Sequence, residues 1–105
     1  MMSGKYITIT GIRHYYGRAA FEIGDKVRCL KDRENVYDKE AIKVMLPKFG
    51  QVGNVANSVN TVKAGTMSAG RIYDKVDESF RAKVLFIDDY AVIAEVIEKK
   101  NKKKK

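Results

Sequence analysis

Two short stretches of the chain gather side chains that could contact a nucleic acid. Residues 11–17 read Gly-Ile-Arg-His-Tyr-Tyr-Gly, and residues 33–42 read Arg-Glu-Asn-Val-Tyr-Asp-Lys-Glu-Ala-Ile. The guanidinium group of Arg13 can hold a phosphate, while the rings of Tyr15 and Tyr37 can stack on bases. Residue types in this combination are compatible with binding of a nucleic acid.

Each of these residues also has a purely structural interpretation. Tyrosines in the loops of small barrels often form half-buried edges. Asp38 could be an Asx-turn residue that opens the strand after it. His14, the one histidine of the chain, fits a surface or pocket wall better than a catalytic base.

The sequence lacks the common signatures of catalysis. It has no Gly-Lys-Ser/Thr phosphate loop and no Gly-x-Ser-x-Gly elbow. One cysteine, Cys29, and one histidine cannot build a standard structural zinc site. We therefore expect no enzyme, no metal and no cofactor, and an enzyme acting on nucleotides is the weakest of the functions considered.

Composition points to one small folded domain with a charged end. The chain has 105 residues, of which 45% are hydrophobic, enough for a compact core. Its formal net charge is +8, but the six lysines within 99–105 leave 15 basic against 13 acidic residues over positions 1–98. We expect 99–105 to be a disordered tail that aids solubility or tethers nucleic acid without specificity.

Hydropathy indicates neither a membrane span nor a signal peptide. The longest uninterrupted apolar run is the five residues 90–94. We expect a cytoplasmic protein that does not contact a membrane.

Alternation of apolar and polar residues is the dominant pattern, and it predicts β-strands. Turn residues at 24–25, 47–50 and 88–89 separate the alternating runs. The pattern predicts a mainly β fold, a small six-stranded OB-like barrel with an SH3-like barrel as the alternative. The expected strands lie near residues 6–12, 26–31, 41–46, 51–55, 80–87 and 90–97.

The alternation also predicts the core and one interruption. The barrel should close around Ile7, Ile9, Val27, Ile42, Val44, Val84 and Val92, and Cys29 should join this core. Between the fourth and fifth strands we expect a short helical insertion. Asn57 or Ser58 could cap a helix that ends at Gly65, and further helical turns could run from Ser68 to Val76.

The stretches 11–17 and 33–42, followed by Gln51-Val52-Gly53-Asn54, resemble the HIRAN domain. The pattern of that family is Gly, then Tyr and Gly a few residues later, then Asn-Pro-aromatic-Asp-x-x-Ala-Ile-x-Val and finally Val-Gly. The resemblance runs from Thr10 to Val55, and residues 70–74 resemble free-standing bacterial members. It implies a HIRAN-like barrel over residues 1–98.

The resemblance further implies binding of single-stranded DNA at its free 3′ end. An Arg-aromatic pair after the first strand and a Tyr-Asp pair before the third line the end-binding pocket of the family. The residues carried over to this chain are Arg13, His14 or Tyr15, Asn35, Tyr37 and Asp38. A carboxylate such as that of Asp38 can accept the proton of a 3′-hydroxyl and would repel a 3′-phosphate.

Three positions depart from the family pattern. Val36 stands where the family usually has proline, and Asn54 and Asn57 stand where DNA-binding members have histidine and lysine. We count Asn54 and Asn57 in the expected interface, but their lack of charge favours an alternative function. That alternative is a protein-interaction adaptor that keeps the barrel and has lost DNA binding.

The expected function is thus a non-catalytic module that binds single-stranded DNA and its 3′-hydroxyl end. DNA repair is the process that the resemblance suggests. A separate helicase or nuclease is a further candidate partner.

Overall fold

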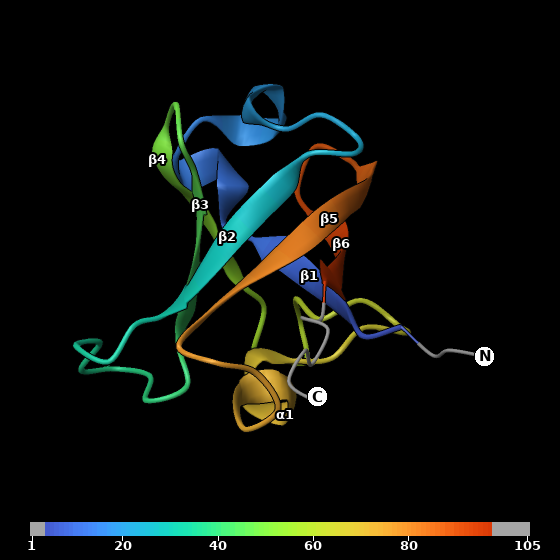
Figure 1. Ribbon diagram of the computed structural model, residues 1–105. Coiled ribbons are helices and arrows are strands. Elements are labelled where there is room, and N and C mark those ends of the chain that lie inside the picture. The colour runs from blue at the N-terminus through green and yellow to red at the C-terminus, as the bar shows by residue number, and fades with distance from the viewer. Residues whose placement is uncertain (1–3, 98–105) are drawn as a thin grey trace, which may run out of the picture.

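The structure is a computed structural model that describes residues 4–97, so the predicted lysine tail lies outside the described residues. Figure 1 shows strands wrapped into a barrel, with 3-10 turns at the top of the view and one short helix at the bottom. The elements in chain order are β1 (Tyr6–Thr10), η1 (Ile12–His14), η2 (Gly17–Ala20), β2 (Lys26–Lys31), β3 (Ile42–Leu46), β4 (Gly50–Val55), α1 (Ala69–Tyr73), β5 (Ser79–Ile87) and β6 (Val92–Ile97).

The six strands form a closed barrel in the order β1-β4-β3-β2-β5-β6. Every neighbouring pair is antiparallel, including the β1–β6 pair that completes the circle. Closure leaves no open sheet edge in this part of the chain, which removes a common route to aggregation. The predicted mainly β, six-stranded barrel is therefore confirmed.

Period-two alternation fills the barrel with apolar side chains, as expected. The seven predicted core residues are each 0% exposed. Cys29 is equally buried, and this desolvation raises the pKa of its thiol to about 12. The thiol is therefore protonated and unreactive at neutral pH. The burial of Cys29 confirms its expected place in the core.

β1 and β6 are each two residues shorter than the sequence predicted, and each has a local reason. β1 ends at Thr10 because Gly11 adopts a left-handed conformation, φ 71°, and turns the chain into η1. β6 begins at Val92 rather than at residue 90. The Asp88 carboxylate accepts hydrogen bonds from the backbone N–H groups of Tyr90 and Ala91, both at 2.8 Å, and holds them in the preceding turn.

The insertion between β4 and β5 contains one of the two expected helices. Ser68 caps α1, since its hydroxyl accepts a hydrogen bond from the Arg71 N–H at 3.2 Å. The helix expected from Asn57 or Ser58 to Gly65 is wrong, because residues 58–61 form only a turn. None of the helices within residues 4–97 is long and apolar enough to cross a membrane.

The insertion also covers part of the outer side of β1. Thr8 points away from the core, yet it is 0% exposed. Its hydroxyl lies 2.8 Å from that of Thr66 and accepts a hydrogen bond from the Lys63 N–H at 3.1 Å. Met67 forms a parallel bridge with Ile7, so the insertion pairs with β1 where β4 does not.

Candidate nucleic-acid interface

The first predicted motif leaves β1 as a tight turn anchored by one apolar side chain. Gly11 turns the chain, and the buried Ile12 fixes η1 to the barrel. The three residues that follow, Arg13, His14 and Tyr15, are consequently exposed. The turn presents a cation, an imidazole and a phenol to solvent on a short, hydrogen-bonded backbone.

Tyr90 joins this motif from the turn between β5 and β6. The guanidinium carbon of Arg13 lies 4.8 Å from the centre of the Tyr90 ring, within cation–π range. Arg18 on η2 forms an exposed ion pair with Asp89 of the same turn, at 3.0 Å. Sequence reasoning missed Tyr90 because the alternation placed it inside the sixth strand. The adjacent Asp88-Asp89 pair was the signal that it belonged to a turn.

The Asp88 carboxylate holds the Tyr90 turn in shape. Its hydrogen bonds from the backbone N–H groups of Tyr90 and Ala91 stabilise the ionised form, and they lower the pKa of Asp88. The backbone of Tyr90, on whose ring the Arg13 guanidinium lies, is therefore held in place. Tyr90 as a residue is 65% exposed.

An aromatic pair, Tyr16 and Phe49, lies beside the 3-10 turns. The ring centres of Tyr16 and Phe49 are 4.9 Å apart and the rings are tilted by 49°. Phe49 belongs to the turn between β3 and β4, so three connections of the barrel contribute aromatic side chains near this end. The sequence pattern predicted no role for Phe49.

The second predicted motif is shaped by side-chain hydrogen bonds to the backbone. The Asn35 Oδ1 accepts from the N–H groups of both Tyr37 and Asp38, each at 2.9 Å. Asp38 Oδ1 accepts from the Glu40 N–H at 2.9 Å, which is the Asx turn that the structural interpretation predicted. The Tyr37 side chain takes no part in this scaffold and is 96% exposed.

Asn57 links the second motif to α1. Its Nδ2 donates to Asp38 Oδ2 and to Glu40 Oε1, both at 3.4 Å, while its Oδ1 accepts from the Gly70 N–H at 2.8 Å. The structure therefore brings Asp38 and Asn57 together. It also gives Asn57 a structural task that its sequence position did not reveal.

Asn54 lies between the two motifs because the strands of the barrel are staggered. The register places Thr10, the last residue of β1, beside Asn54 of β4, and Asn54 beside Lys43 near the start of β3. The first motif follows Thr10 and the second precedes β3, so both border this row of residues. Asn54 Oδ1 accepts a hydrogen bond from Gln51 Nε2 at 3.0 Å.

The side chains of the two motifs make their contacts with different segments. Arg13 packs on Tyr90, whereas Asp38 bonds to Asn57. In Figure 1 the η1 and η2 turns lie at the top of the view, and the connection from β2 to β3 extends to the lower left. Seven of the eight predicted residues thus form two groups, and the eighth, Asn54, lies on the strand between them.

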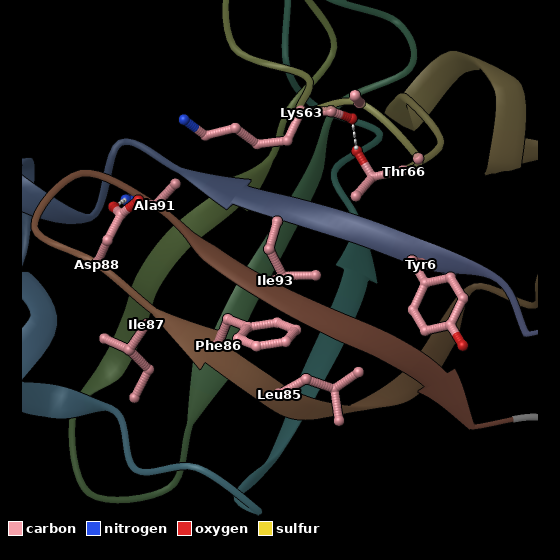
Figure 2. A pocket seen from close by; sticks show the side chains of 11 residues that line it. Tyr6, Lys63, Thr66, Leu85, Phe86, Ile87, Asp88, Ala91 and Ile93 are labelled. Atoms are coloured by element: carbon pink, nitrogen blue, oxygen red, sulfur yellow. Dashed lines mark hydrogen bonds between the residues drawn. The ribbon is translucent and has the colours of Figure 1, made fainter.

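The described part of the chain also has an apolar groove, which begins beside the Tyr90 turn, where Asp88 and Ala91 line it. It has a volume of about 590 Å³ and runs over the outer sides of β1, β5 and β6. Figure 2 shows Leu85, Phe86 and Ile93 on its floor, with Tyr6 at one end. None of the eight predicted site residues lines this groove.

Comparison with solved structures supports the barrel assignment. The crystal structure of the HIRAN domain of human HLTF is similar with a TM-score of 0.64 and 22% sequence identity, covering 90% of this chain and 73% of that chain. A protein from Lactobacillus plantarum is similar with a TM-score of 0.62 and 16% identity, covering 88% of each chain. No curated protein matches this sequence.

The family model of the HIRAN domain matches residues 5–78. This range covers well over half of the chain and includes both motifs, the Asn54 row and α1. The chain therefore belongs to the HIRAN domain family, a family known as a nucleic-acid-binding module.

Proposed function

We propose that this protein binds single-stranded DNA and recognises its free 3′-hydroxyl end. The proposal is supported by the exposed Tyr37, which precedes Asp38 in the chain on a backbone that Asn35 holds in place. A ring held out in this way suits stacking on a terminal base, because little backbone freedom is lost on binding.

The Asp38 carboxylate would accept the proton of the 3′-hydroxyl. Its two oxygens accept hydrogen bonds from the Glu40 N–H and from Asn57. A carboxylate has about four lone-pair sites, so acceptor capacity remains for a hydroxyl. The same charge would repel a 3′-phosphate. Asp38 would therefore strengthen binding of a 3′-hydroxyl end and weaken binding of a 3′-phosphate end.

Arg13, His14 and Tyr15 would contact the strand behind its terminal nucleotide. Tyr90 extends this group, because a base could stack on the ring that already carries the Arg13 guanidinium. Asn54 lies between this group and Asp38, where its amide could donate to a phosphate. In this proposal the protein is a binding module, and any reaction at the DNA end belongs to a separate helicase or nuclease.

Binding of labelled oligonucleotides by the intact chain tests this function. A single strand with a 3′-hydroxyl should bind more tightly than the same strand with a 3′-phosphate, and more tightly than a blunt duplex. Equal affinity for the two single strands would contradict end recognition, even if binding itself were strong.

A protein-interaction adaptor is the second candidate, and the apolar groove is the observation that favours it. Phe86 is 66% exposed and lines the groove together with Leu85 and Ile93, and a contiguous apolar surface of this kind can mark a protein-interaction site. An adaptor that had lost DNA binding would show no preference among the three oligonucleotides. The same experiment therefore separates the two candidates.

A further inference from the structure

The outer side of β2 and β5 carries four exposed cations in two cross-strand pairs. The register sets Arg28 directly opposite Arg81, and Lys26 directly opposite Lys83. All four are exposed, because the residues that alternate with them fill the core. Figure 1 shows β2 and β5 side by side across the front of the barrel. We call these four residues the β2–β5 basic face.

Like charges directly opposite one another across two strands repel and destabilise a sheet. Here two such pairs follow each other, and none of the four cations forms an ion pair with a carboxylate of residues 4–97. Among their cross-strand register partners within residues 4–97, one is acidic, Glu95 opposite Lys83 on β6, and Asp25 precedes Lys26 in the chain. An arrangement of this kind is unfavourable on its own and becomes favourable when a polyanion covers it.

We propose that the β2–β5 basic face binds the phosphate backbone of the same nucleic acid whose end is held at Tyr37 and Asp38. The inference rests on the proposed function and adds a second contact surface to it. Successive outward residues on a strand lie about 6.8 Å apart, so the face offers a regular array of charges. The planar guanidinium groups of Arg28 and Arg81 can each bind a phosphate with two hydrogen bonds.

Continuity with the candidate interface favours a nucleic acid over an acidic protein as the occupant. Lys43 pairs with Asn54 on one side and with Leu30 on the other, and Leu30 is the next outward residue after Arg28. Lys43 is thus a positive charge between Asn54 and the β2–β5 basic face. A strand leaving the interface across β3 would reach Arg28 without crossing an acidic residue of β3 or β2.

The experiment compares linear and circular single-stranded DNA of equal length, because a circle has no 3′ end. The full chain is compared with the double variant Arg28→Gln/Arg81→Gln. A matched control, Arg71→Gln/Lys75→Gln, removes the same charge from exposed residues on and after α1. A conservative variant, Arg28→Lys/Arg81→Lys, keeps the charge. The measured quantity is the slope of log affinity against log salt concentration.

Loss of two phosphate contacts should reduce the magnitude of this slope by about 1.4 for single strands. We expect that reduction for both linear and circular DNA in Arg28→Gln/Arg81→Gln, and no such reduction in the control or the conservative variant. The ratio of linear to circular affinity should stay high, since phosphate contacts carry no information about the end.

The outcomes separate this inference from the proposed function. Equal slopes in the two glutamine variants would overturn the basic face, whether or not the protein prefers linear DNA. Equal affinity for linear and circular DNA would contradict end recognition while leaving the slope result intact. Binding of poly-glutamate through Arg28 and Arg81, without any binding of DNA, would identify an acidic protein as the occupant and overturn the inference.

Discussion

Hydrogen bonds to the backbone, rather than side-chain packing, position Tyr37 and Asp38. Asn35 accepts two backbone N–H groups and thereby fixes the peptide that carries both residues. The sequence could predict that this motif forms a turn or a binding loop, because an Asn-x-Tyr-Asp stretch before a strand suits both. It could not predict that Asn57 would join Asp38 and Glu40 to α1, since that contact spans 19 residues of chain.

Substitution of Tyr37 tests whether this ring stacks on a base. Tyr37→Ala should weaken binding of any single strand by about 1–3 kcal/mol, because one base loses its aromatic partner. The neighbouring Val36→Ala is the control, since Val36 is also exposed, at 82%, and cannot stack. Fluorescence anisotropy gives both affinities, and circular dichroism checks that both variants fold. Equal affinity of the two variants would exclude Tyr37 from the interface.

At the level of the elements, period-two alternation located five of the six strands and their buried sides. It is weak in the fourth, β4, where Val52 and Gly53 are both buried. Alternation does not contain the stagger between strands, which depends on loop geometry and on the irregularity between Val44 and Met45 of β3. That stagger places Thr10, Asn54 and Lys43 in one row. The sequence therefore supplied eight candidate residues, but it indicated neither the contact of Tyr90 with Arg13 nor the arrangement of the candidates in space.

Tyr90 and the segment 57–65 show where local patterns gave the wrong element. Tyr90 continued an apolar run and was assigned to a strand, but the hydrogen bonds that Asp88 accepts hold it in a turn. Val59 and Val62 have helical spacing, yet Val59 is 94% exposed and Ser58 begins only a turn. In both places side-chain hydrogen bonding to the backbone outweighed hydropathy.

Gly53 tests how closely the first motif packs on β4. A Cβ at this position would lie 2.8 Å from Ile9 Cγ2, 3.0 Å from the Thr10 carbonyl oxygen and 3.2 Å from Ile12 Cγ2. Gly53→Ala should therefore lower the free energy of unfolding by about 1–3 kcal/mol, as overpacked cores do.

Urea denaturation measures this change in the free energy of unfolding. Asn54→Ala is the comparison, because the Asn54 side chain lies outside the core and its loss creates no clash. An unfolding midpoint for Gly53→Ala equal to that of the parent would show that a Cβ at residue 53 fits without a clash with β1 or η1.

At the scale of the whole molecule, charge is divided between the barrel and the C-terminal lysines. Truncation after Glu98 removes six of the 21 basic residues. We expect this to flatten the salt dependence of DNA binding, because fewer counterions are released from the DNA. The ratio of 3′-hydroxyl to 3′-phosphate affinity should not change. A collapse of that ratio on truncation would show that discrimination lies in the tail and not in the barrel.

In the proposed function Asp38 recognises the 3′ end, so substitution of Asp38 should change the preference between two kinds of end. The ratio of 3′-hydroxyl to 3′-phosphate affinity is determined for the parent, for Asp38→Ala and for Asp38→Asn. Asparagine can keep the hydrogen bond from the Glu40 N–H that shapes the Asx turn, so it removes the charge while preserving the loop.

We expect a ratio well above one in the parent and a fall toward parity in both variants. The fall should come from weaker binding of 3′-hydroxyl ends and from the loss of repulsion toward 3′-phosphate ends. A folded Asp38→Asn that binds the two ends with the same ratio as the parent would contradict the account and favour the adaptor.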